Sequence, residues 1–282
     1  MKKKILKIGA LVLAIVLIVG VCLFANALIG NPISKALAKK TAEKHIQQVY
    51  GDRDYELNEV TYSFKDGYYH ATVSSPASMD TYFTLSINSF GKLRYDNYEY
   101  QVTNGWNTAH RLGDEYRKIV ETVINSSSFP YHHSLGYGEL VFVSREDKEL
   151  IPEVADYALI TNELKTDAYY NVNELGAQSG KLTLYIDERT VSAERLAEIL
   201  LGIRECFDEA GVGFYAIDCV LEYTQNEDAE YQYGRVEVME LLYADIYEEG
   251  MVERVKASND AANAYYAAQD AEKLGEIEEG ME

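Results

Sequence analysis

An apolar stretch near the N-terminus constrains this chain more than any other feature. Residues 8–29 carry no charge and are apolar apart from two glycines and Asn26. As a helix rising 1.5 Å per residue, the stretch is about 33 Å long, enough to cross the hydrocarbon core of a bilayer. Four lysines precede it, and no second such stretch follows in the sequence. We therefore expect residues 1–30 to form a cytoplasmic tail and a transmembrane anchor, with the membrane contacted through residues 8–29.

A cleaved secretory signal is the alternative interpretation of the same residues. Ala25-Asn26-Ala27 fits a small-x-small cleavage site, which would release a chain cut after Ala27. The apolar run before that site spans residues 8–24, longer than the usual 7–15 residues of a signal peptide. We expect the span to be retained. The tail lysines flank it directly, so we expect the N-terminus to be cytoplasmic and the bulk extracytoplasmic.

Charge is strongly asymmetric along the chain. The formal net charge is -20, and residues 1–30 contribute four lysines and no acid. Residues 207–282 hold 20 acidic residues against four basic ones. Such an acidic region repels nucleic acid and anionic lipid headgroups, so we expect no nucleic-acid partner. The three cysteines exclude a disulfide scaffold, and the spacing of Cys206 and Cys219 predicts two buried free thiols.

The first half reads as a helix followed by strands. Apolar residues recur at helical spacing from Ser34 to Gly51, with lysines on the opposite face. Those lysines could contact acidic lipid headgroups, although we expect a solvated face. The period then changes to two, which predicts antiparallel strands near residues 60–64, 69–73, 83–87 and 93–95. With a further helix over 109–123, these elements define an N-terminal α+β domain at residues 31–128.

Three motifs carry a resemblance to a known family. The residues are Gly30-Asn31-Pro32-Ile33-Ser34-Lys35-Ala36-Leu37, then Asp80-Thr81-Tyr82-Phe83, and later Phe214-Tyr215-Ala216-Ile217-Asp218-Cys219-Val220-Leu221-Glu222-Tyr223. They resemble the YfjL-like proteins of Gram-positive bacteria, an uncharacterised family. The resemblance implies membrane attachment and a two-part ectodomain, and it transfers no catalytic residue. More loosely, residues 34–100 resemble a PepSY-type or cystatin-like module.

The second half, residues 129–282, predicts an acidic C-terminal α+β domain. It opens on a turn-rich stretch at 129–138, where Phe129-Pro130 marks the boundary. We expect a short helix within 171–179, a strong helix over 192–210 and an alanine-rich helix over 251–274, with a frayed tail beyond Gly275. Strands are expected at 140–143, 182–186, 217–221 and 236–246. The predicted fold class is therefore α+β: one N-terminal transmembrane helix, a helix with an antiparallel strand meander, then helices on one face of a sheet.

No stretch of the sequence predicts a catalytic, cofactor-binding or metal-binding residue. Gly176-Ala177-Gln178-Ser179-Gly180-Lys181 has Leu175 and Leu182 where a phosphate loop needs glycine and serine or threonine. His132-His133 are adjacent, so on extended chain they point to opposite sides. Asp52, Asp54 and Glu56 alternate like a calcium loop, but Leu57 replaces its glycine and Ser63 its final acid. We interpret these segments as a helix end, an extended pair and a solvated turn.

These observations lead to a non-enzymatic expectation. We expect a membrane-anchored protein that acts by binding a protein or cell-wall partner at the cell surface. Tyrosine, with 24 residues, suits half-buried strands, and Tyr98, Tyr100, Tyr231 and Tyr233 in polar surroundings could also serve an interface. A regulator or inhibitor of an extracytoplasmic peptidase is the main alternative. An enzyme with its site in residues 129–138 is the third.

Overall fold

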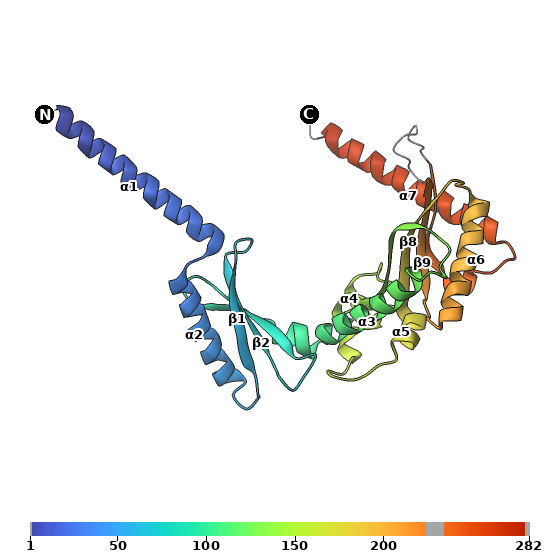
Figure 1. Ribbon diagram of the computed structural model, residues 1–282, viewed down its shortest axis with the longest axis horizontal. Coiled ribbons are helices and arrows are strands. Elements are labelled where there is room, and N and C mark those ends of the chain that lie inside the picture. Colours follow the sequence, from blue (N-terminus) through green and yellow to red (C-terminus); the bar gives the residue numbers. More distant parts are fainter. Residues whose placement is uncertain (1, 224–233, 280–282) are drawn as a thin grey trace. The chain divides into compact units, whose positions relative to one another are not determined.

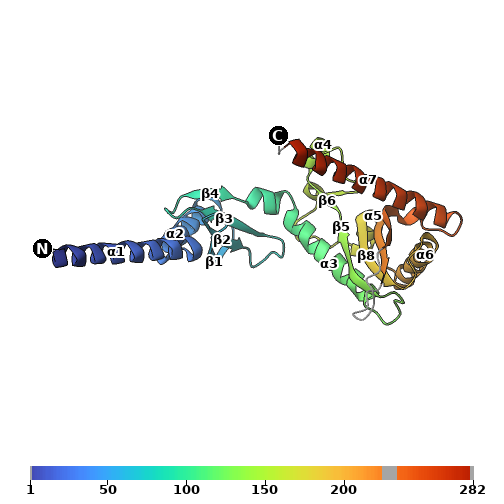
Figure 2. The same cartoon turned by 90° about the horizontal axis from the view of Figure 1, so that it is seen from above.

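The computed structural model describes residues 2–223 and 234–279, and the chain divides into two compact units. Unit 1 comprises Met1–Thr108 with Asn162–Ala168, and unit 2 comprises Ala109–Thr161 with Tyr169–Glu282. Each unit combines helices with its own four-stranded sheet (Figures 1 and 2). The predicted α+β class, with an apolar N-terminal helix before two mixed units, is confirmed.

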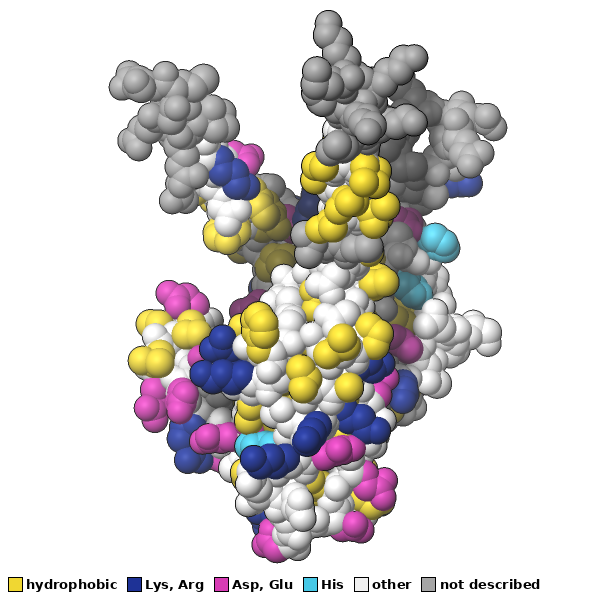
Figure 3. Space-filling view, turned by 90° about the vertical axis from the view of Figure 1, so that its left-hand side faces the viewer, with side chains coloured by type: hydrophobic (Ala, Val, Ile, Leu, Met, Phe, Trp, Pro, Cys, Tyr) yellow, Lys and Arg dark blue, Asp and Glu magenta, His cyan; other side chains and the backbone are white. Residues whose placement is uncertain are grey.

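The apolar stretch forms helix α1, Lys2–Ile29. Among the side chains of this helix that the structure describes, the large apolar ones from Leu11 to Ile29 are exposed, Ile29 by 77 %. Figure 3 shows the described part of this helix as a run of apolar side chains. Among the described residues, α1 is the one helix long and apolar enough to cross a membrane, a test that a signal sequence near the N-terminus also passes.

The end of α1 is fastened to unit 1 by two tyrosines. The chain turns at Gly30, whose φ of 69° places it in the left-handed region. The Asn31 N–H donates to the Tyr69 hydroxyl at 2.8 Å, and that hydroxyl donates to the Asn31 carbonyl at 3.2 Å. Tyr62 donates its hydroxyl to the Ala27 carbonyl at 3.1 Å. A Cβ at Gly30 would lie 2.6 Å from the Tyr69 oxygen, so the close approach requires glycine.

Unit 1 packs one helix on an antiparallel meander. Helix α2, Pro32–Val49, begins at the Asn31 cap, whose side chain accepts from the Ser34 N–H. Its small buried residues Ala38 and Ala42 let it approach the sheet closely. The strands are β1 (Glu56–Ser63), β2 (Tyr68–Ser74), β3 (Tyr82–Ile87) and β4 (Leu93–Asp96), paired in that order. Alternating residues of β2 and β3 fill the core, as the period of two predicts.

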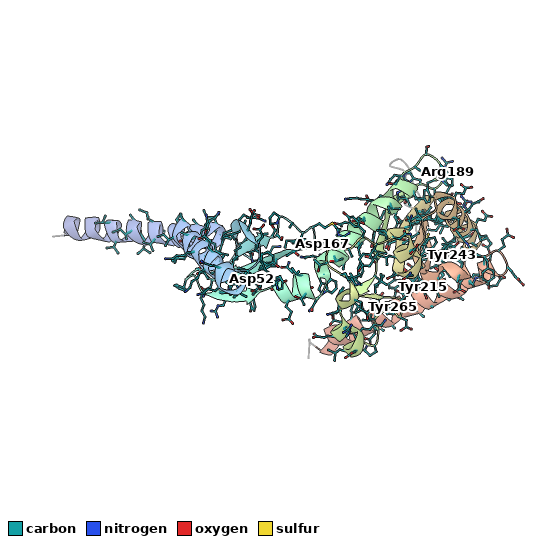
Figure 4. The ribbon with its side chains drawn as sticks, turned by 90° about the horizontal axis from the view of Figure 1, so that it is seen from below. Asp52, Asp167, Arg189, Tyr215, Tyr243 and Tyr265 are labelled. Carbon is teal, nitrogen blue, oxygen red and sulfur yellow. The ribbon has the colours of Figure 1, made fainter. Side chains whose placement is uncertain are left out.

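A segment from the second half of the sequence completes unit 1. The Asp167 carboxylate, labelled in Figure 4, accepts through Oδ1 from the Ser78 hydroxyl and from the N–H groups of Met79 and Asp80 at 2.9–3.0 Å. In return, Asp80 Oδ2 accepts from the Asp167 N–H and from the Thr108 hydroxyl, both at 2.9 Å. Asp80 is 1 % exposed, so these donors replace the water that its carboxylate loses.

Unit 2 contains the second sheet, in the order β10-β9-β8-β5. Its strands are β5 (His133–Leu140), β8 (Gly180–Glu188), β9 (Ala216–Tyr223) and β10 (Arg235–Leu242). Strands β8 and β9 are parallel, joined through helix α6 (Ala193–Ala210), and the other pairs are antiparallel. Smaller elements are β6 (Phe142–Val143), α4 (Arg145–Leu150), β7 (Leu159–Ile160) and α5 (Val172–Ser179), with short helical turns at Glu99–Thr103, Thr161–Glu163 and Tyr243–Asp245. The strand predicted at 236–246 is shorter in the structure, where β10 ends at Leu242.

Strand β5 corrects the prediction of a turn-rich boundary at 129–138. The strand pairs with β8 along its length although its sequence shows no alternation of large apolar residues. Helix α3, Trp106–Ile124, explains why. A Cβ at Gly138 would lie 2.5 Å from Val120, and one at Gly136 would lie 2.8 Å from Ile124, so small residues here admit the helix. From Ala109 onward, α3 lies in unit 2. The domain bounds of 31–128 and 129–282 stay predictions.

Helix α7, Met251–Glu279, closes the outer edge of β10. The Asn259 side chain accepts from the Glu237 N–H at 3.0 Å, and the Ser258 hydroxyl accepts from the Met239 N–H at 3.2 Å. These alternate N–H groups point away from β9, so side chains of the helix take the place of a further strand. The helix continues through Gly275 to Glu279, where a frayed tail was predicted. The helix-favouring residues around that glycine outweigh its modest cost.

Tyr69→Phe should weaken unit 1. Removing the hydroxyl leaves the Asn31 N–H without its partner, whereas the Asn31 carbonyl still accepts from the Lys35 N–H at 3.0 Å. The loss should lower the free energy of unfolding by about 1.5 kcal/mol. Urea denaturation followed by tyrosine fluorescence in detergent would measure it. Tyr68→Phe, at the neighbouring position of β2, is the control and should change stability little; equal effects of both substitutions would contradict the role of this contact.

Candidate functional site

A hollow of about 590 Å³ opens in unit 2 where three helices meet. Helix α3 contributes the end of its buried side, α5 its first turn and α6 its last turn. Its lining combines apolar and polar side chains: Ile119, Thr122, Val123, Ser126, Ser128, Asn173, Cys206, Glu209, Ala210 and Val212. We call this the helix-end hollow. A mainly apolar concavity with a few polar groups is the usual form of a small-molecule or side-chain binding site.

The hydroxyl groups of the helix-end hollow are engaged with each other and with the backbone. The Ser126 and Ser128 hydroxyls lie 2.9 Å apart, and Thr122 donates to the Lys118 carbonyl at 2.8 Å. The arrangement suits non-covalent binding of a neutral or cationic group, because Glu209 carries the charge of the lining.

The Cys206 thiol is the most nucleophilic type of group in the helix-end hollow, and its surroundings reduce its reactivity. Burial, and then the Glu209 and Glu205 carboxylates, raise the pKa of the Cys206 thiol. Cys219 is fully buried on β9, where burial raises its pKa to about 12. Both thiols are free, although Cys206 is only half-buried where full burial was predicted. Thiolate, the nucleophilic form, is thus disfavoured at both positions.

A histidine, an aspartate and a tyrosine come together in unit 1. His45 Nε2 lies 2.7 Å from Asp96 Oδ2, and the Tyr50 hydroxyl donates to the same oxygen at 2.8 Å. Burial, and then Asp96, raise the pKa of the Tyr50 hydroxyl, which keeps it a hydrogen-bond donor. This network joins the end of α2 to β4, and its tyrosine is tuned away from nucleophilic chemistry.

Tyrosines also gather around one arginine in unit 1. The Arg53 guanidinium lies 5.2 Å from the ring centre of Tyr98 and within 6.0 Å of those of Tyr50 and Tyr55. Such cation–π contacts hold the turn after α2 against the sheet. Tyr100, singled out by its polar surroundings, stacks on Trp106 and is 56 % exposed. Tyr231 and Tyr233 lie outside the described residues.

The glycine-rich segment forms the predicted helix end. Helix α5 ends at Ser179 and β8 begins at Gly180, so Lys181 enters a strand. The Lys181 ammonium pairs with Asp218 at 2.8 Å and with Glu240 at 3.3 Å. Although burial acts to lower it, these carboxylates raise the pKa of Lys181. The glycines have a packing role, since a Cβ at Gly176 or Gly180 would lie about 2.5 Å from the Tyr116 side chain.

The remaining sequence candidates do not converge. His132 Nδ1 lies 3.0 Å from Asp187 Oδ2, whereas the His133 ring packs edge-on against Phe129. Asp52 and Asp54 are exposed in the turn before β1, and Figure 4 labels Asp52 there. Across the described residues, no three histidine, cysteine, aspartate or glutamate side chains are placed to hold a metal ion.

The fold defines a class of protein in which an exposed apolar helix precedes two α+β units in the sequence, and the second unit contains the helix-end hollow. Two family profiles match the chain. The profile of the YfjL-like N-terminal domain matches residues 2–97, and that of the YfjL-like C-terminal domain matches residues 115–256. The chain belongs to the YfjL-like family. Searches of curated proteins and of solved structures found no match.

Alkylation of the folded protein should distinguish its thiols. In a Cys22→Ser chain at pH 8, iodoacetamide should label Cys206 slowly and Cys219 not at all, because raised pKa values reduce the thiolate fraction. The Cys206 rate should keep rising above pH 8.5, the range of an ordinary thiol. Glu209→Gln should speed the reaction, and Glu149→Gln on α4 should not.

Mass spectrometry of both labelled peptides measures the rates. After unfolding in urea both thiols should react at the rate of a free cysteine. Rapid labelling of Cys219 in the folded protein would contradict the packing of β9 described above.

Proposed function

We propose that this YfjL-like protein is a single-span membrane protein whose two units lie outside the cytoplasm and bind a partner without catalysing a reaction. One observation carries the proposal: an exposed apolar helix is fastened at its end to a folded unit. The helix supplies the membrane attachment, and the helix-end hollow of unit 2 supplies the binding surface.

The junction supports retention of the span over cleavage. A signal peptide is separated from the mature domain by an extended, accessible site. Here Ala27 lies within α1, and its carbonyl accepts from Tyr62. The Asn26 side chain also accepts from the Asn31 amide at 2.8 Å. Cutting after Ala27 would remove both contacts from unit 1, whereas a retained anchor keeps them.

Charge supports the orientation. The tail lysines flank the span on its N-terminal side, and positive residues next to a span favour the cytoplasmic face. The chain beyond residue 30 sums to -24, which keeps its distal parts away from anionic headgroups. The partner that we propose for unit 2 is a protein or cell-wall component with neutral or cationic groups.

The non-enzymatic assignment follows from the pKa values of the reactive groups. The thiol of Cys206 and the hydroxyl of Tyr50 both have pKa values raised by burial, the direction opposite to that of an activated nucleophile. In residues 129–138, the third candidate site, His133 onward belongs to β5, and the glycines at 136 and 138 make room for α3. We therefore assign binding rather than catalysis to the helix-end hollow.

Regulation of an extracytoplasmic peptidase remains the alternative. The observation that favours it is that β1 is an edge strand of the unit 1 sheet. An exposed edge strand can accept an extended peptide by strand addition, as inhibitory modules do. Reduced activity of a co-expressed cell-surface peptidase in the presence of the full chain would favour this alternative.

Topology can be tested with intact protoplasts. Added protease should digest the region after Gly30, and the chain should stay in the membrane pellet after a carbonate wash because the span holds it in the bilayer. Lysed protoplasts serve as the control for protease access. Full protection of the C-terminus would reverse the orientation, and recovery from the medium of a chain starting at Leu28 would show cleavage.

Binding in the helix-end hollow can be tested by photo-crosslinking in cells. A photoreactive residue at Thr122, on the rim, should give an adduct of one defined mass, whereas the same residue at Lys118, one turn earlier on α3, should not. Ala210→Trp should abolish the Thr122 adduct because the indole fills the hollow, and Ala267→Trp on α7 is the matched control. An adduct that survives Ala210→Trp would contradict the site.

A further inference from the structure

A groove of about 480 Å³ lies between α2 and β1 in unit 1. The helix lines one side and the strand the other, and the lining residues are Pro32, Lys35, Ala36, Lys39, Leu57, Asn58, Glu59 and Val60. We call it the lysine groove. We propose that the lysine groove binds the headgroup of an anionic, hydroxyl-bearing phospholipid from the leaflet that surrounds the end of α1. This inference rests on the proposed anchoring of the chain through that helix.

The position of the lysine groove relative to the span is fixed. The groove begins at Pro32, three residues after the last residue of α1. Tyr62 and Tyr69 face each other in the β1–β2 pair. Their hydroxyls form hydrogen bonds with the backbone of Ala27 and Asn31, respectively. The groove therefore lies at a set height above the hydrocarbon core instead of on a free tether.

Its height matches the headgroup layer. Lys35 follows Ile29 by six residues, a separation of about 9 Å at the helical rise and somewhat more across the turn at Gly30. The polar layer on each side of a bilayer is about 5–8 Å thick, and lysine side chains extend toward it along apolar surface. The Lys35 ammonium can thus reach the level of the lipid phosphates. Figure 3 looks onto the side of unit 1 that α2 covers, where basic side chains stand out.

The chemistry of the lysine groove selects the kind of lipid. Lys35 and Lys39 are four residues apart, so both ammonium groups lie on one side of α2 and can approach a single phosphate. Lys39 makes one long contact, to Glu43 at 3.9 Å, with both side chains more than half exposed, which is a weak competitor. Pro32, Ala36 and Leu57 offer apolar surface to the glycerol and upper acyl region.

Glu59 adds selectivity on the opposite wall. Its carboxylate would repel a bare phosphate, yet it accepts hydrogen bonds from hydroxyl groups. A headgroup that carries hydroxyls beside its phosphate, as phosphatidylglycerol does, satisfies both walls: phosphate toward the lysines and hydroxyls toward Glu59. The lining carries two lysines against one glutamate, so its net positive charge favours an anionic lipid over a zwitterionic one.

The test uses the full chain in nanodiscs made from equal parts phosphatidylcholine and phosphatidylglycerol. Native mass spectrometry after release from the nanodisc counts the lipids retained by each chain. Wild type should retain phosphatidylglycerol preferentially. Lys35→Gln with Lys39→Gln should lower that affinity by about 25-fold, since each lysine contributes about fivefold.

Lys40→Gln with Lys44→Gln is the matched control, because it removes the same charge from α2 outside the groove. The control pair should retain the preference of wild type. Equal losses in both pairs, or no preference in wild type, would overturn the proposal. Flotation with vesicles separates the two levels: a chain that does not float contradicts the anchor, and one that floats without preference contradicts the lysine groove alone.

Discussion

The rest of the structure depends on two hydrogen bonds between the Tyr69 hydroxyl and the Asn31 backbone. These bonds lie at the junction between the apolar helix α1 and the sheet of unit 1. The hydroxyl accepts one hydrogen bond and donates another, so both backbone polar groups at the turn are satisfied while Tyr69 itself stays 1 % exposed. With Gly30 allowing the close approach, the folded unit begins at the end of the helix without a linker.

Tyrosine repeats this role elsewhere in the chain. The Tyr116 hydroxyl donates to the Gly213 carbonyl at 2.9 Å from within the core of unit 2, and burial raises its pKa, which keeps the proton on the donor. Tyr243, labelled in Figure 4, donates to Asp208 at 2.7 Å. Each ring fills apolar volume while its hydroxyl satisfies a polar group. Much of the tyrosine content that suggested an interface is therefore structural.

Sequence periodicity predicted the elements whose secondary structure follows from the spacing of their own apolar residues. The alternating residues of β2 and β8 and the stripe of α6 were placed correctly because their burial follows from spacing alone. Strand β5 was not, because its glycines are dictated by Val120 and Ile124 on another element. The helix-end hollow was missed for the same reason: Ser126, Asn173 and Glu209 are far apart in sequence, and each looks like an ordinary surface residue. Cys206 carried the one usable signal, a thiol beside a buried stripe.

Under the proposed membrane anchoring, the cover that α7 places over β10 has a consequence for many copies of this chain on one surface. Proteins held in a membrane diffuse in two dimensions, and shared confinement raises their effective concentration far above that of the same chains in solution. An uncovered row of strand N–H groups would then meet the same edge of other copies often enough for the strands to pair edge to edge. With Asn259 and Ser258 bonded to alternate N–H groups of β10, that edge is closed to neighbours, and crowding does not become self-association there.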